Sequence, residues 1–352
     1  QLPCHPLLCA AIYKLTDTTY YLLTARLASV VFDILTVICI FSIISRIFRP
    51  YCTDGVVLAI AGAAMFVFNP YSSYLCGLAW NHDMVLLCII LSFRIFLEPQ
   101  RTQKPQRLNL FKMDLRIFLA ASLLTIAVWT RATTFFVMTV FLAMTLINTE
   151  SFRHGLTRIN TISGKWISAL AGITLCSIWP AWIALKSSKA FLINIFTIPI
   201  LNAQLLHKLA IAHSKTYLTI MALRNMEFLL LLSTAVLVWG CVFCLRRKIE
   251  LVQKQNMLLC AAMLTALFIT AYIPPTMWKQ YLGLPVPFMI IFLTYGLLLL
   301  KINSSKLFGI CRFVFIAMTV MTVMMHKPQL QIIKFLKMDN WTPINLHQIS
   351  KN

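Results

Sequence analysis

Charged side chains are scarce in this 352-residue sequence, and acidic ones are the scarcest. Only 12% of the residues are charged, whereas roughly a quarter are charged in a typical soluble domain. Hydrophobic residues make up 60% of the chain, and its mean hydropathy is +0.81. Because this leaves too little polar surface to clothe a water-soluble globule, the composition predicts an integral membrane protein.

Several signatures of soluble chemistry are also missing. The sequence has no glycine-rich phosphate loop, no zinc-ligand spacing and no nucleophile elbow. Its 11 cysteines lie mostly inside apolar runs, where cysteine acts as a small hydrophobe. The only close pair, Cys241 and Cys244, precedes a basic cluster and is typical of a helix end. No disulfide framework is therefore expected, and a lone CxxC is weak grounds for metal or redox chemistry.

Basic residues outnumber acidic ones by 31 to 10, which gives a net charge of +21. No soluble segment carries a basic stripe with interleaved aromatics, so nucleic acid is not an expected partner. The positive charges fall instead between the apolar runs, where Lys and Arg set the orientation of membrane helices. This pattern predicts loops that lie against membrane lipid.

The sequence contains ten apolar runs, and most of them are near the roughly 20 residues that a helix needs to span a bilayer. They lie near 22–48, 56–75, 84–97, 116–130, 132–147, 166–185, 226–245, 257–275, 281–300 and 307–325. Spanning segments must satisfy their backbone polar groups internally, so all are predicted to be helical. The fold class expected is all-α: a polytopic transmembrane bundle of about nine or ten hydrophobic segments, with a short helical hairpin near 116–147. We expect one transmembrane domain over 1–325.

Clusters of basic residues orient this bundle. The linkers 94–116 and 246–254 are strongly basic, so we expect them in the cytoplasm. The opposite, outer face then receives segment 1–20, the 76–83 turn, the Arg131 tip, a 186–225 loop, the 274–281 turn and the 326–352 tail. This alternation requires a first spanning helix before Gln1, so the chain is expected to be truncated at its N-terminus.

Two acidic residues within the apolar segments are candidates for function, since charge is costly there. Asp83 stands at the outer mouth of a helix, flanked by Asn81 and His82. It is either a functional carboxylate or a helix cap, and the pattern leaves both open. Asp33 lies in the middle of the first helix, where a buried polar bond, for example to Arg26, is the simpler interpretation.

Four other residues near the outer face are candidates. Arg131 joins the two short helices, where a cation either extends toward the interface or holds a phosphate. Lys279 and Tyr281 follow Trp278, a combination that also fits an ordinary interfacial belt. His5 precedes Pro6 near the start of the chain, and one histidine alone is not a metal site.

The order of several motifs resembles the GT-C superfamily of membrane glycosyltransferases, in particular the bacterial branch with aminoarabinose transferases and relatives of protein O-mannosyltransferases. The motifs are His5-Pro6 followed by Ala25-Arg26-Leu27-Ala28-Ser29, then Asn69-Pro70, Asn81-His82-Asp83, Arg131, Lys279-Gln280-Tyr281-Leu282 and Leu284-Pro285-Val286-Pro287-Phe288. They spread over residues 5–300, and each is degenerate when taken singly. Leu7 replaces the second proline of the family's HPPL segment. The family's first-loop acidic residue, generally given the catalytic role, would precede Gln1.

The resemblance implies a glycosyltransferase at the outer face of a bacterial inner membrane. Its donor would be a polyprenyl-phosphate sugar, and its acceptor would be a lipid, a glycan or a protein. Asp83 would position the acceptor or a divalent metal, while Arg131, Lys279 and Tyr281 would bind the donor phosphate, with His5 and His82 as further site residues.

A transporter or flippase for a lipid or polysaccharide is the main alternative, and a non-enzymatic membrane subunit is another. A transporter should show internal repeats and interrupted helices lined by polar groups. An enzyme should show acidic and basic residues that converge at one outer cavity. No repeat is visible in the sequence.

Overall fold

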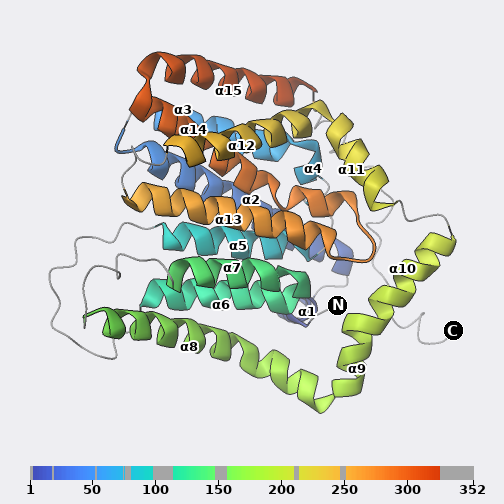
Figure 1. Ribbon diagram of the computed structural model, residues 1–352. Coiled ribbons are helices and arrows are strands. Elements are labelled where there is room, and N and C mark those ends of the chain that lie inside the picture. The colour runs from blue at the N-terminus through green and yellow to red at the C-terminus, as the bar shows by residue number, and fades with distance from the viewer. Residues whose placement is uncertain are drawn as a thin grey trace.

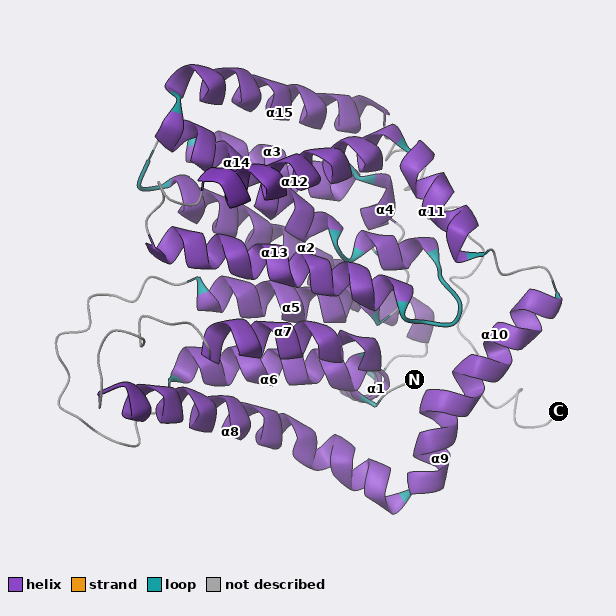
Figure 2. Cartoon of the chain, in the orientation of Figure 1, coloured by secondary structure: helices purple, strands orange, loops and turns teal. Residues whose placement is uncertain are grey.

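The computed structural model describes residues 3–17, 20–51, 54–73, 75, 81–97, 114–146, 157–209, 214–245 and 251–325. Their regular structure is helical throughout, and these ranges contain no strand (Figure 2). The predicted all-α bundle is therefore confirmed. The main helices are α1 (Cys4–Thr16), α2 (Tyr21–Phe48), α3 (Gly55–Phe68), α4 (Pro70–Ser73), α5 (His82–Phe96), α6 (Leu115–Thr130), α7 (Phe135–Leu146), α8 (Thr157–Lys186), α9 (Ser188–Leu192), α10 (Ile198–Lys208), α11 (Lys215–Arg224), α12 (Met226–Leu245), α13 (Leu251–Tyr272), α14 (Val286–Asn303) and α15 (Ser305–Met325).

Six of the helical stretches in the described ranges are long and apolar enough to cross a bilayer. A seventh is added if α11 and α12, which meet at an angle of 91°, count as one broken span. The helices α3 and α6 and the stretch Ala132–Met144 are apolar but shorter. The lengths of the apolar helices therefore agree with the composition, and both indicate a multi-pass membrane protein.

Helix α14 forms the centre of the bundle (Figure 1). It packs against α2, α3, α12, α13 and α15, and every residue from Val286 to Leu299 is buried. A helix that is apolar on all sides is stable only when other apolar groups surround it. Here the surrounding groups are protein, so α14 does not contact lipid over this length.

The perimeter of the bundle has the opposite character. Large apolar side chains are exposed on α2, α8, α12 and α15, and Phe313 and Leu237 are examples at 72% and 68% exposure. A soluble monomer rarely exposes so much contiguous apolar surface. Hydrocarbon is the solvent that this surface fits.

The short hairpin predicted near 116–147 is confirmed. Helix α6 begins at Asp114, whose carboxylate accepts the backbone N–H groups of Arg116 and Ile117, as expected of an N-cap. Helix α7 returns beside α6 after a short 3₁₀ turn, η1 (Ala132–Thr134). The hairpin tip lies at the same end of the bundle as the start of α5, and we call this the Arg131 end.

Helices α6 and α8 pack through small side chains. Ser168 and Gly172 lie four residues apart on α8 and face α6 together with Ala169. A Cβ added at Gly172 would lie 2.5 Å from the Phe118 carbonyl oxygen, so only glycine permits this approach. Ser168 also accepts the Asp114 backbone N–H at 2.7 Å, which ties the start of α6 to α8.

The expected outer loop over 186–225 is wrong in its conformation. Its described residues, 186–209 and 214–225, are mostly helical and form α9, a π-helical stretch η3 (Ile193–Thr197), α10 and then α11. The physical reason is that its charges stand near the ends of a long apolar stretch, which leaves the interior of that stretch free to form a helix. Figure 1 shows that α9 and α10 run across the Arg131 end of the bundle.

Candidate functional site at the Arg131 end

The start of α5 brings the first candidate residues into place. Asn81, not Asp83, occupies the N-cap position of this helix. The Asn81 side-chain amide donates a hydrogen bond to the Thr130 carbonyl oxygen at 3.1 Å, which joins the start of α5 to the end of α6. Asp83 lies in the first turn and is 1% exposed. Capping in the strict sense therefore does not account for Asp83.

Arg131 lies where the backbone leaves α6. Its φ of −149° and ψ of 107° are extended, so the helix stops there and the 3₁₀ turn begins. The Arg131 Nε–H donates to Thr133 Oγ1 at 3.0 Å, and the side chain is 8% exposed. The guanidinium is thus held inside the protein instead of extending into water.

Arg131 meets two other candidates from distant parts of the chain. Its Nη1 lies 3.0 Å from His82 Nδ1, and its Cζ lies 4.1 Å from the centre of the Tyr281 ring. His82 and Tyr281 also make an edge-to-face contact, with 5.4 Å between ring centres. Because a guanidinium can only donate, His82 Nδ1 accepts, and the neutral imidazole carries its proton on Nε2.

The remaining guanidinium nitrogen shows what this cluster could bind. Arg131 Nη2 is buried and has no hydrogen-bond partner among the described residues. A buried donor without a partner costs about 1–3 kcal/mol, and more when it is charged. An anionic oxygen placed against Nη2 would remove that cost and would gain a charge-assisted hydrogen bond.

Tyr281 is held by a close backbone approach. It belongs to the 3₁₀ turn η5 (Lys279–Gly283), which packs against α4. A Cβ added at Gly283 would lie 2.5 Å from the Tyr71 carbonyl oxygen and 2.6 Å from Leu75 Cδ1. Gly283 therefore permits the contact that fixes η5, and with it the Tyr281 ring, beside Arg131.

The other predicted site residues lie in the same region with less defined roles. Lys279 is the first residue of η5 and is half-buried. His5 is buried in α1, close enough to His82 for an electrostatic interaction, and its Nε2 lies 3.9 Å from Cys9 Sγ. Burial lowers the pKa of the His5 imidazole, so its neutral form is favoured.

A metal centre has little support in the described residues. These ranges contain no group of three or more His, Cys, Asp or Glu side chains arranged to hold a metal ion. Within these ranges, Asp83 therefore belongs to no such group.

Asp33 and Arg26 both belong to α2, two turns apart. Arg26 is buried and Asp33 is half-buried, as expected of polar side chains that turn toward other helices. Their pairing with each other stays a prediction.

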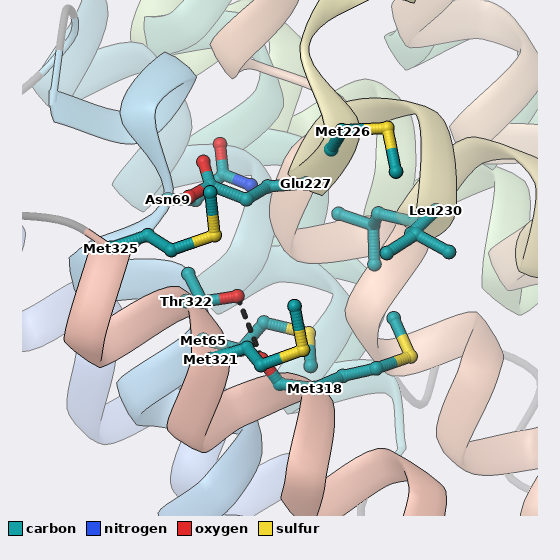
Figure 3. Close-up of a pocket in the computed structure, with 10 residues that line it drawn as sticks. Met65, Asn69, Met226, Glu227, Leu230, Met318, Met321, Thr322 and Met325 are labelled. Carbon is teal, nitrogen blue, oxygen red and sulfur yellow. Dashed lines mark hydrogen bonds between the residues drawn. The ribbon is translucent and has the colours of Figure 1, made fainter.

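A separate cavity lies between α3, α12 and α15 (Figure 3). It measures about 190 Å³ and is lined by Met65, Asn69, Met226, Glu227, Leu230, Leu231, Met318, Met321, Thr322 and Met325. Sequence reasoning missed Glu227, although it is the first acidic residue after a long stretch without any. The predicted residues Asp83, Arg131 and Tyr281 do not line this cavity, so the two features are distinct.

Comparison of the chain with known protein families, with curated proteins and with solved structures found no match in any of the three.

Proposed function

We propose that this protein is a membrane glycosyltransferase. It would transfer a sugar from a polyprenyl-phosphate donor to a lipid, glycan or protein acceptor at the outer face of the membrane, and a bacterial inner membrane is the setting that the motif resemblance favours. The observation that carries the proposal is the buried Arg131 guanidinium. Its Nη2 has no partner among the described residues, and it lies at the end of the bundle next to the helix that bears Asp83.

The chemistry needs a cation and a carboxylate in this arrangement. The acceptor oxygen attacks the anomeric carbon, and the bond from that carbon to the phosphate oxygen breaks. Polyprenyl phosphate leaves with the electron pair, and a base takes the acceptor proton. Arg131 would stabilise the negative charge that develops on the phosphate, and its low exposure makes that interaction strong.

Four residues would then support the two reacting groups. The hydrogen bond to His82 and the contact with the Tyr281 ring limit the freedom of the guanidinium before the donor binds. Asp83 follows His82 directly in the chain and would position the acceptor. Lys279 would add a second positive charge near the lipid phosphate.

Donor binding tests the role of Arg131. In the full-length protein, Arg131→Ala should weaken binding of a polyprenyl phosphate by about 1.5–3 kcal/mol, or roughly 10- to 150-fold. Arg312→Ala is a matched control, because Arg312 pairs with Asp54 at the opposite end of the bundle. Equal affinities of the wild type and Arg131→Ala, measured by calorimetry in detergent micelles, would rule out the phosphate contact.

Sugar transfer tests the role of Asp83. Asp83→Asn keeps the size of the side chain and removes its charge, so transfer should fall by roughly 10²-fold or more if the carboxylate supports the reaction. If Asp83 only favours the helix dipole, stability should change by about 0.3–1 kcal/mol and transfer should persist. The assay is turnover of polyprenyl-phosphate sugar by the reconstituted full-length protein. Wild-type turnover by Asp83→Asn would refute the proposed role.

The same vesicles separate an enzyme from a flippase. A flippase would move a labelled polyprenyl-phosphate sugar between the leaflets without consuming it. The proposed enzyme would release polyprenyl phosphate only when an acceptor is present.

A further inference from the structure

The helical segment from Ser188 to Lys208, made of α9, η3 and α10, is the least buried part of the described chain that could span a membrane. Its Ser188–Leu206 window passes the length and hydropathy tests for a span, yet only 6% of that window is buried. Figure 1 shows the segment running across the bundle end instead of along the bundle. Its exposed apolar side chains therefore need an environment other than the rest of the bundle.

The connections show that the segment enters at the Arg131 end. Trp129, two residues before Arg131, donates from Nε1 to Ser177 Oγ on α8 at 3.0 Å. The Trp129 ring also contacts Phe191 of α9, with 6.1 Å between ring centres. Helix α8 therefore reaches the Arg131 end before α9 begins.

The chain is at the same end again just after α10. Lys215 of α11 donates to the carbonyl oxygen of Tyr272, the residue that closes α13. Phe228, near the start of α12, contacts Tyr71 of α4 at a tilt, with 4.7 Å between ring centres. Helices α4 and α13 both pack against η5, which carries Tyr281.

This arrangement excludes a single crossing by α9 and α10. A crossing would leave Leu209 on the far side of a hydrocarbon core of about 30 Å. From Leu209 to Ser214 the chain advances five residues, which reach at most roughly 18 Å when fully extended. The segment therefore begins and ends in the same leaflet.

Aromatic and basic side chains indicate the depth of the segment. Trp179 and Trp182, in the last turns of α8, are about half exposed, and tryptophan is enriched at the headgroup level of membranes. Lys186 lies over the Trp182 ring, with its Nζ 5.0 Å from the ring centre. Helix α9 begins two residues later, so it starts at that same level.

The exposed surface of the segment is apolar with positive ends. Lys186 and Lys189 stand before it and at its start, Lys208 closes it, and no acidic residue occurs from 157 to 226. The exposed apolar residues are Leu192, Ile193, Phe196, Ile198, Ile200, Leu201, Leu205 and Leu209. Anionic lipid phosphates over acyl chains complement both features.

We propose that Ser188–Lys208 is an interfacial helix. It lies in the headgroup layer of the leaflet at the Arg131 end, with its apolar side chains among the upper acyl chains. Lys186, Lys189 and Lys208 bind the phosphates of anionic phospholipids there. The proposal is independent of sugar transfer and holds for any activity of the protein.

Fluorescence quenching tests the depth. A fluorescent unnatural amino acid is placed singly at Ile193, Ile200 or Leu205 of the full chain, which leaves the native cysteines untouched. The vesicles contain phosphatidylcholine brominated either near the glycerol or near the chain end. All three positions should show the same shallow depth. A steady gradient of depth along the segment would show that it spans the membrane. An absence of quenching, together with cross-links between two copies of the protein, would show a protein interface. Either result refutes the proposal.

Lipid selectivity tests the lysines. Brominated phosphatidylglycerol should quench the label at Ile193 more effectively than brominated phosphatidylcholine. Lys189→Gln with Lys208→Gln should reduce that preference by about fivefold for each lysine, the equivalent of about 1 kcal/mol each. Lys301→Gln with Lys306→Gln, at the opposite end of the bundle, should leave it unchanged. Equal quenching by the two lipids in the unsubstituted protein would refute anionic-lipid binding.

Discussion

The seam between α6 and α8 permits a quantitative test, in which a glycine of the seam is compared with a glycine elsewhere. At Gly172 an added Cβ would lie 2.5 Å from the Phe118 carbonyl oxygen and 2.8 Å from Ser122 Oγ. Because the nearest atom belongs to the backbone, no rotamer change relieves the contact, and the helices must separate. At Gly309, on α15, an added Cβ would meet nothing within 4 Å.

The two substitutions should therefore have opposite effects. Gly172→Ala should lower the free energy of unfolding by about 1–3 kcal/mol, the usual cost of overpacking. Gly309→Ala should leave it unchanged or raise it by up to about 1 kcal/mol, because alanine favours the helix. The net loss at Gly172 is reduced by that same propensity gain, so its measured value should fall toward the lower part of the range.

Unfolding in mixed micelles measures both effects. The denaturing detergent is titrated against the purified protein, and tryptophan fluorescence follows the transition. Trp129 reports on this seam directly, since its indole donates to Ser177 of α8. If Gly172→Ala were as stable as Gly309→Ala, the close approach of α6 and α8 would be wrong.

Two further predictions concern the Arg131 end. Tyr281→Leu removes the ring that lies 4.1 Å from Arg131 Cζ, so it should lower the free energy of unfolding by about 2 kcal/mol. Tyr281→Phe keeps the ring and should lower it much less. Equal losses in the two variants would refute the cation–ring contact. The orientation of the bundle predicts that thiols introduced at Ser73 and Gln280 react with an impermeant reagent from outside. Thiols introduced at Gln103 and Lys248, which lie outside the described residues, should not react. Labelling of Gln103 from outside would refute the predicted orientation.

The helical part of the fold could be predicted because apolar run length is a direct signal. Each of the ten predicted runs contains helix among its described residues, and 56–75 is broken at Asn69 into α3 and α4. The helices within 186–225 are harder to predict, because the apolar stretch from Ser188 to Leu206 is flanked by lysines that suggest a loop. The 91° bend between α11 and α12 has no comparable signal in the sequence.

The site could be predicted residue by residue but not as a cluster. His82, Arg131 and Tyr281 were each candidates, since each stands at a helix boundary in an apolar region. Their meeting spans 49 residues in one pair and 150 in the other, and it depends on how α5, α6 and η5 pack. The N-cap position of Asn81 depends on where α5 begins, and a shift of one or two residues is beyond pattern reading.

The burial of α14 has a consequence for how the protein is made. Helix α14 follows four of the five helices that surround it in the chain, so α2, α3, α12 and α13 enter the membrane before their common partner exists. Until then, the side chains of these helices that will contact α14 face lipid or one another. A nascent chain that stops before Val286 lacks its centre, and quality-control proteases should recognise it even though most of its helices are already inserted.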